Sequence, residues 1–397
     1  MICRFFSFAA LSLALAFNVP TRAATPIPPP TDDECAAFGR QIASWLSTHD
    51  LAAFEESLDL QALLDRVTNG FDLSGKEASD FQSGLISGMK NGVFRDLGGV
   101  RQAHFLRVVQ RPEGKRAIVR IHLKFGVNYS EFICTRQADG KLKWVDEFNY
   151  SSGDMLSISL RNDALPMIAD LKKGALDRLT NSESDYAKHV PEIARATSLF
   201  RAGKPAEAES LLKALPVEVQ TNHAVLVVRL QVAQAVSESD YLEVIQDWEK
   251  AYPNDSALAL ISIDGDIMRK NFTGAIAHVD LLDRMVGGDP YLDCIRGNIY
   301  VAAKNYPMAK QSANAALEAD PHLATAYDIL LGASLAEGDF NETAEVLERV
   351  ERVFPHADMA KSIKGDPAFA KFLLSPAYAK WIEQRSHTVN DESGQKP

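Results

Sequence analysis

Residues 290–321, PYLDCIRGNIYVAAKNYPMAKQSANAALEADP, decide the fold of the C-terminal half of the chain. The stretch divides into two helix-forming halves joined by a short turn. The small residues Gly297 and Ala309 allow the two helices to touch. The ring of Tyr300 fills the space beside them, and Pro321 ends the second helix because proline cannot continue it.

Pairs of a polar and an aromatic residue recur around this stretch. They are Asp240-Tyr241, Asn271-Phe272, Asn305-Tyr306 and Asp339-Phe340. Successive pairs are about 34 residues apart, with the first interval slightly shorter than the other two. Such a repeat indicates stacked helix pairs, since one pair cannot bury its apolar face alone. We expect four to five hairpins between about residues 191 and 355, within a helical region of residues 170–385 that ends in capping helices. The polar tail, residues 386–397, is expected to be disordered.

This period and the small, aromatic and proline positions of residues 290–321 resemble the tetratricopeptide repeat. Other copies are looser: near Phe272, Asp266 stands at the aromatic position and Gly287 replaces the proline. The resemblance implies an all-α superhelical solenoid after an α+β N-terminal domain. In that family the first helix of each hairpin lines a concave groove, which binds a protein or peptide partner.

The resemblance also implies which positions contact the partner. They fall on Tyr291, Asn298 and Val301 in the best repeat, and on Leu260, Asp264, Met268 and Asp328 in its neighbours. Asn298 takes the position from which family members often hold the backbone of a bound peptide; a solvated helix residue is the alternative. Where some members place lysines that grip a C-terminal carboxylate, this chain has Cys294 and Ala302, so that recognition is not expected.

The N-terminal half has a different pattern. Helical periodicity from Asp32 to about Leu97 gives way to strand-like segments at residues 103–110, 117–123, 129–136 and 142–150. Asp139-Gly140 predicts a hairpin turn between the last two. In the second segment apolar and polar residues alternate, which predicts a strand with one buried face and one solvated face. A last helix is expected from about Gly153 to Leu165, where Pro166 would end it.

Residues 32–165 are therefore expected to form an α+β domain. The order of helices, antiparallel strands and a closing helix resembles the NTF2-like family of cone-shaped domains, although here the helices precede all the strands. This resemblance implies a pocket between the sheet and the helices. Four aromatic side chains either line that pocket or pack in the core: Trp45, Trp144, Phe148 and Tyr150.

Cysteines and histidines point to no metal chemistry. Cys35 and Cys134 fall in the same domain and are the candidate disulfide pair, with buried free thiols as the alternative. The nine histidines show no metal-ligand spacing. The sequence also lacks a nucleophile elbow, a phosphate-binding loop and a dinucleotide-binding glycine motif. We therefore predict no metal, no cofactor and no catalytic residue.

The first residues have the features of a secretory signal peptide. Arg4, an apolar run at residues 5–17 and small residues near Ala23 indicate a signal at residues 1–24, cleaved near Ala23 and followed by a proline-rich linker at residues 25–31. A periplasmic or secreted protein is expected. Stable membrane insertion after cleavage is not, because a spanning helix needs about 20 apolar residues. The formal net charge of −11 argues against nucleic-acid binding, which requires a basic face.

Two functions are compatible with these features. The first is an exported, non-enzymatic scaffold or adaptor that binds a protein or peptide through the concave face of the repeats. The second is an enzyme or small-molecule-binding protein with its site in the pocket of the α+β domain, while the repeats recruit a partner. A cavity that holds a carboxylate or histidine with a shifted pKa would favour the second function.

Overall fold

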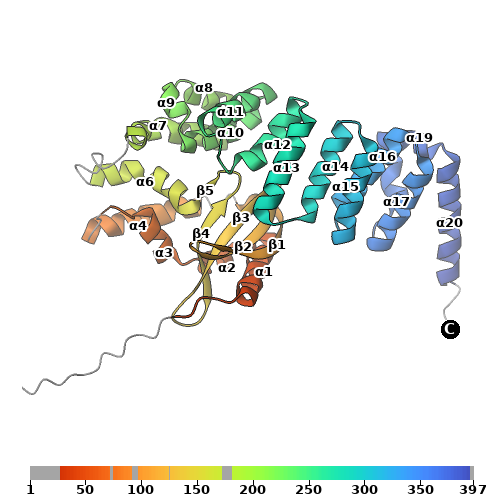
Figure 1. Cartoon of the computed structure of the whole chain (residues 1–397), viewed down its shortest axis with the longest axis horizontal. Helices are drawn as coiled ribbons and strands as arrows, with labels where there is room; N and C mark the ends of the chain where they lie inside the picture. Colours follow the sequence, from red (N-terminus) through yellow and green to blue (C-terminus); the bar gives the residue numbers. More distant parts are fainter. Residues whose placement is uncertain (1–26, 72–74, 92–96, 125, 172–180, 394–397) are drawn as a thin grey trace, which may run out of the picture.

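The computed structural model describes residues 27–71, 75–91, 97–124, 126–171 and 181–393. It has an antiparallel sheet with helices around it, followed by a long array of helices (Figure 1). This confirms the α+β region and the helical region that the sequence predicts. The predicted signal peptide, its cleavage site and the start of the linker lie outside the described residues. Within the described residues, no helix has the length and apolar character needed to cross a membrane.

The N-terminal region is built around a meander of five strands. Its elements are α1 (Asp32–Thr48), α2 (Leu51–Glu56), α3 (Leu60–Val67), α4 (Gly75–Asn91), β1 (Val100–Arg111), β2 (Gly114–Leu123), β3 (Val127–Arg136), β4 (Leu142–Asn149), β5 (Asp154–Met155) and α6 (Leu156–Leu171). The strands follow the order β1-β2-β3-β4-β5, and each neighbouring pair is antiparallel. The first four strands match the predicted ones, while the short β5 was not predicted.

The closing helix α6 is longer than expected. It continues past Pro166 to Leu171, so the predicted end at Leu165 is wrong. The fixed backbone angle of proline is compatible with a helix, and its missing N–H removes only one hydrogen bond. Because α6 packs against α3, α7 and β4, the helix continues through the proline.

The helical array consists of successive helix pairs. They are α7 (Asn181–Arg201) with α8 (Pro205–Lys213), α10 (His223–Val236) with α11 (Glu238–Ala251), α12 (Leu258–Met268) with α13 (Phe272–Val286), α14 (Pro290–Ala302) with α15 (Tyr306–Ala319), and α16 (Ala324–Glu337) with α17 (Phe340–Val353). A single turn, α9 (Val217–Gln220), precedes α10. The short α18 (Met359–Ser362) and α19 (Ala370–Leu373) and the final α20 (Pro376–Ser393) close the array. Since α20 reaches Ser393, most of the predicted disordered tail is helical.

The recurring polar residues start the second helix of three pairs. Asn271, Asn305 and Asp339 are the N-caps of α13, α15 and α17, and each side chain accepts a hydrogen bond from the helix backbone. The residue before each cap is left-handed, with φ near 58° at Lys270, 57° at Lys304 and 75° at Gly338. The repeat period seen in the sequence is therefore the period of this turn. Asp240 differs, because Ser237 caps α11 three residues earlier.

One face of the sheet packs against the N-terminal helices. Phe54 lies between Trp144 and Phe132, with ring centroids 5.1 and 5.9 Å away. The indole N–H of Trp144 donates to the hydroxyl of Ser57 at 3.0 Å. Trp144 and Tyr150 are almost fully buried, while Trp45 and Phe148 are partly buried and pack against the cores on opposite faces of the sheet. Core packing therefore accounts for Trp144, Phe148 and Tyr150, while Trp45 also lines a cavity of about 620 Å³ beside α1.

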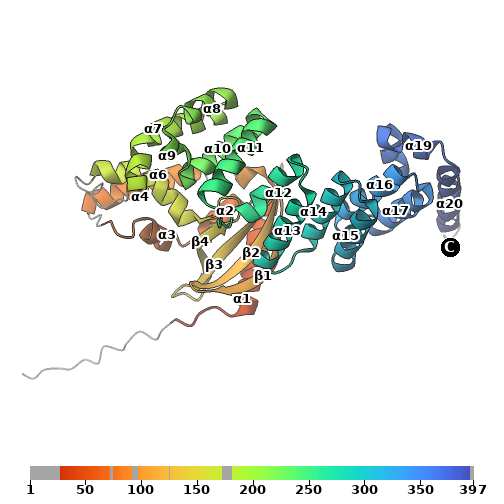
Figure 2. The same ribbon diagram turned by 45° about the horizontal axis from the view of Figure 1, so that its top comes forward.

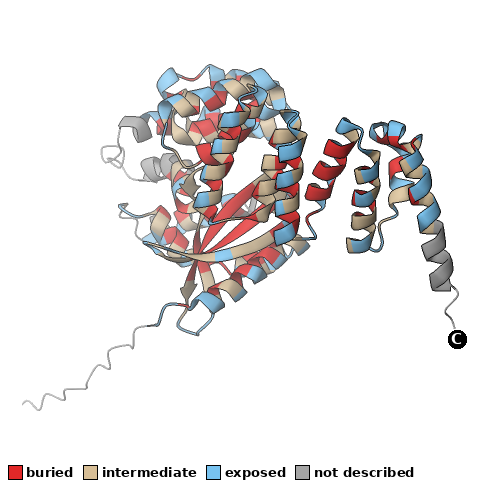
Figure 3. Ribbon diagram, turned by 45° about the vertical axis from the view of Figure 1, so that its right-hand side comes forward, coloured by how far each residue is buried: buried red, intermediate tan, exposed pale blue. Residues whose placement is uncertain are grey.

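The other face of the sheet packs against the helical array. Ile118, Tyr129 and Tyr150 share a core with residues of α12, α13 and α14, such as Ile263 and Leu292. Figure 3 shows the buried strands beneath these helices. The prediction of one solvated face for β2 is wrong, because the polar side chains on this face form contacts with the repeats.

Candidate functional site

Figure 2 shows α10, α12 and α14, the first helices of three pairs, beside the sheet. Residues of these helices and of one end of the sheet line a groove. Its cavity has a volume of about 430 Å³, within the range of ligand sites in proteins. Aliphatic side chains form most of its wall: Leu123, Val127, Val227, Leu230, Leu260, Ile261, Ile263, Ile267 and Ile295. Its polar side chains are Asn128, Ser151, Gln231, Gln234, Tyr241, Asp264, Tyr291 and Asn298.

Four of the seven predicted partner-binding residues line this groove. Leu260 and Asp264 come from α12, and Tyr291 and Asn298 from α14. The ring of Tyr291 also meets the sheet: the guanidinium carbon of Arg120 lies 4.9 Å from its centroid, and His122 meets it edge-on at 4.6 Å. The predicted concave surface is therefore covered at one side by the sheet.

The other three predicted residues do not line this groove. Met268 is partly exposed near the C-terminal end of α12. Val301 packs against the core formed with α16 and α17. Asp328 is exposed on α16.

The sequence analysis missed the residues that the sheet and α10 contribute. One of them could have been found, because Leu230, Asp264 and Asn298 are spaced by one repeat period each. Leu123, Val127 and Asn128 could not, because no pattern in the sequence says which helices the end of the sheet meets. Residues of both the α+β region and the helical array therefore form the groove.

Two hydrogen-bond acceptors of the groove lack a strong protein partner. Asp264 remains in contact with solvent, but the surrounding protein removes part of its hydration and raises the pKa of its carboxyl; the hydroxyl of Tyr241, 3.5 Å away, opposes this. Asn128 is 7% exposed, and its Nδ2 donates to Asn149 at 3.0 Å. Its Oδ1 has no partner among the described residues. Both acceptors favour a ligand that donates hydrogen bonds.

A buried ion pair holds the sheet against the start of α14. Asp289, 5% exposed, pairs with Arg120 of β2 and accepts a hydrogen bond from the hydroxyl of Tyr129 at 2.8 Å. The same carboxylate is the N-cap of α14, where it accepts from the backbone N–H of Tyr291 at 3.1 Å. One side chain therefore fixes both the helix and the sheet on one wall of the groove.

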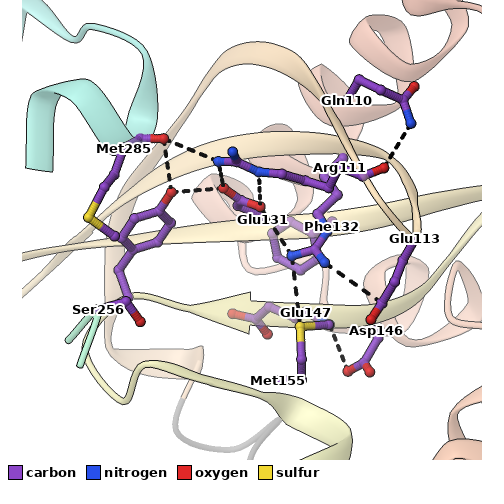
Figure 4. A network of polar contacts seen from close by, with 12 residues as sticks. Gln110, Arg111, Glu113, Glu131, Phe132, Asp146, Glu147, Met155, Ser256 and Met285 are labelled. Carbon is purple, nitrogen blue, oxygen red and sulfur yellow. Dashed lines mark hydrogen bonds and ion pairs between the residues drawn. The ribbon is translucent and has the colours of Figure 1, made fainter. Parts of the chain in front are cut away.

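A second network lies between β3 and the end of α13. Glu131, 2% exposed, accepts hydrogen bonds from Arg111 at 2.6 Å, from Arg116 at 3.2 Å and from the hydroxyl of Tyr150 at 2.8 Å. Arg111 also donates to the main-chain oxygen of Met285 at 3.2 Å. Figure 4 shows Arg111 between Glu131 and Met285. Charged side chains of the sheet, buried together with Glu131, therefore connect the two regions.

A histidine clamp forms a third connection. His223, at the start of α10, has its Nδ1 2.8 Å from Asp154 of β5 and its Nε2 2.6 Å from Asp255. The indole N–H of Trp248 donates to the same oxygen of Asp255 at 2.9 Å. Burial of the ring disfavours its charge, but the two carboxylates outweigh this effect and raise the pKa of His223 to about 9. The protonated ring thus bridges the sheet and the repeats.

The clamp predicts a pH dependence of stability. Because the pKa of His223 rises from 6.5 to about 9 on folding, its contribution is full below pH 6.5 and is lost as the pH rises to 9. The shift corresponds to about 3 kcal/mol, which water around the partly exposed ring reduces to about 2 kcal/mol. Urea unfolding at pH 6.5 and pH 9 measures this loss. His223→Gln should be less stable at pH 6.5 and should lack this part of the pH dependence; an equal slope in both proteins would contradict the prediction.

The two cysteines of the predicted disulfide lie together. Cys35 of α1 and Cys134 of β3 are both buried free thiols, and the Cys134 thiol donates to the main-chain oxygen of Phe132 at 3.5 Å. The neighbouring Cys35 thiol and burial raise the pKa of the Cys134 thiol. The pairing of these residues in space agrees with the sequence analysis, while the covalent bond stays a prediction.

The described residues contain no group of three or more histidine, cysteine, aspartate or glutamate side chains placed to hold a metal ion. A comparison with protein-family models finds no match to the chain. Searches of curated proteins and of solved structures find no match either. The proposal for its function therefore rests on the groove and on the repeat pattern.

Proposed function

We propose that this chain is an exported, non-enzymatic scaffold that binds a segment of a protein or peptide in the groove between its first-helix surface and its sheet. The single observation that carries the proposal is that Leu260, Asp264, Tyr291 and Asn298 line one cavity of about 430 Å³. These positions come from the resemblance to tetratricopeptide repeats, which places ligands on the same surface. The aliphatic walls supply binding energy, and the few polar groups supply orientation.

The structure offers less support to an enzyme or small-molecule site inside the α+β domain. There the rings of Phe54, Phe132 and Trp144 pack together between the sheet and its helices. The α+β domain does have a cavity beside α1 that Glu34 and Trp45 line, but the hydrogen bond from Arg136 lowers the pKa of Glu34 to about 2, so this carboxylate is held ionised in an ion pair. Burial raises the pKa of Glu147 on β4, which lies outside the groove, while Asp264, whose pKa is also raised, lies in the groove on a repeat helix. A small molecule would therefore compete for the same groove as a peptide.

Substitution of Leu260 by arginine tests the groove. The longer, charged side chain should occupy the cavity and pair with Asp264, one helical turn away, which removes the space for a ligand. We expect peptides selected from a displayed library by the full chain to bind the Leu260→Arg variant at least about tenfold more weakly in calorimetry.

The matched control is Leu281→Arg on α13, a leucine that is 39% exposed and does not line the groove. The selected peptides should bind this variant with an affinity within about twofold of that for the unsubstituted chain. A selected peptide whose affinity is unchanged by Leu260→Arg would show that it binds elsewhere and would refute the groove as the working site.

A further inference from the structure

The groove contains a single formal charge. Of the described residues that line it, only Asp264 carries a carboxyl or a basic group, and the other side chains on the wall are aliphatic, hydroxyl or amide groups. Several other acidic side chains of the repeats have cationic partners, as Asp280 and Asp283 have in Arg296. Among the described residues, no lysine, arginine or histidine pairs with Asp264, whose side-chain hydrogen bond is to Tyr241. Asp264 is therefore an anion without a counter-charge.

The arginine of the sheet that contacts the groove wall is already neutralised. Arg120 contacts the ring of Tyr291, which lines the groove, but it is 3% exposed and paired with Asp289. The interaction of Asp264 with the hydroxyl of Tyr241, at 3.5 Å, is too long to compensate for lost hydration. A ligand that brings a positive charge would supply the missing partner.

The surroundings of Asp264 define the shape of that ligand. Leu260 precedes it by four residues and Ile267 follows it by three, so both lie on the same face of α12. Ile295 of α14 also lines this groove. An aliphatic stem with a charged tip fits an apolar wall that carries one carboxylate.

A second acceptor points to the same chemistry. Oδ1 of Asn128 lacks a hydrogen-bond partner among the described residues, and Asn128 lines the same cavity as Asp264. An ammonium group carries three donors and no acceptor, so it matches a wall whose unpartnered polar atoms are acceptors. The net charge of −11 also favours the approach of a cation from solution.

We propose that the groove recognises a lysine side chain of its peptide partner, with the ammonium group on Asp264 and the aliphatic stem against Leu260 and Ile267. This inference rests on the proposed function of the groove and specifies its selectivity. The shared chemistry is an alkylammonium group, and the test separates a peptide from a free amine.

The experiment uses the full chain and two acetylated, amidated peptides, Ala-Leu-Lys-Leu-Ala and the same peptide with norleucine in place of lysine. Norleucine keeps the stem and removes the charge. By calorimetry, the lysine peptide should bind about tenfold more tightly than the norleucine peptide. Asp264→Asn should abolish this preference. Asp328→Asn, at an exposed aspartate outside the groove, should keep it.

Other outcomes overturn the inference in distinct ways. Equal affinities that Leu260→Arg abolishes would refute the lysine preference and leave the proposed groove function intact. If neither peptide binds, hexylammonium is titrated into protein labelled with ¹³C at aspartate carboxyls, with Asp264→Asn to assign the signal. A shift at Asp264 supports the ammonium site, and its absence refutes the site. Hexylammonium that binds as tightly as the lysine peptide would identify a free amine as the ligand and refute the peptide.

Discussion

Replacement of Asp289 by alanine is expected to lower the free energy of unfolding by about 3–5 kcal/mol. The substitution leaves Arg120 without its counter-charge in a position where only 3% of the residue is exposed. It also removes the acceptor of the Tyr129 hydroxyl and the N-cap of α14. The large effect comes from the buried charge that remains, because burial without a partner is far more costly than the loss of an exposed pair.

Urea unfolding of Asp289→Ala, followed by circular dichroism, measures this loss. Asp339→Ala is a matched control, because Asp339 is also an N-cap, that of α17, but its side chain is exposed. The control should lose about 1 kcal/mol. Equal losses in the two variants would mean that Asp289 acts only as a helix cap and that the sheet and the repeats are not joined through Arg120.

The helix pairs could be predicted from the sequence because the residues that form each turn between helices lie within a few positions of one another. A left-handed residue, a polar N-cap and an aromatic residue recur within a few positions, as at Lys304, Asn305 and Tyr306. Close contact within a pair is equally local. A Cβ atom at Gly297 of α14 would lie 3.4 Å from the main-chain oxygen of Ala309 in α15, so the two helices of the pair meet at small residues. Strands and their turns are visible for the same reason.

The packing of the sheet against the repeats could not be predicted from the sequence. Polar residues in an alternating strand are normally assigned to solvent, but here they form the buried interface. Alternation in residues 117–123 of β2 assigns Arg120 to the solvent face, but Arg120 and also Arg116, four residues before it in the same strand, are buried. Their partners, Glu131 and Asp289, stand 15 and 169 residues away in the sequence. A single sequence does not indicate which distant carboxylate neutralises a given arginine, so polar residues destined for such an interface look like surface residues.

The residues of the candidate site also divide into those that the sequence predicts and those that it does not. The repeat pattern placed Leu260, Asp264, Tyr291 and Asn298 on one surface, and the structure brings them to one groove. It did not place Asn128 or Leu123 there, because these depend on the docked sheet. The pattern also included Val301, although this side chain packs into the core with the next pair. Family positions identify a face of a helix, while the neighbouring elements decide which part of that face is open.

Replacement of Glu131 by glutamine is expected to lower the free energy of unfolding by about 3 kcal/mol. Glutamine keeps the shape but removes the charge that Arg111 and Arg116 share, and Arg116 has little access to water. The amide also offers one acceptor oxygen where three donors now meet two. Since Arg111 and the hydroxyl of Tyr150 both reach the main-chain oxygen of Met285, the loss should fall on the contact between β3 and α13.

Chemical unfolding of Glu131→Gln should show one transition at a lower urea concentration, because the contacts of Asp289 and His223 still join the two regions. Glu113→Gln is the matched control: Glu113 also pairs with Arg116, at 3.7 Å, but is 49% exposed. It should change stability by less than about 0.5 kcal/mol, as exposed ion pairs do. A loss below about 1 kcal/mol in Glu131→Gln would show that water reaches both arginines, and the network would then orient the sheet without holding it.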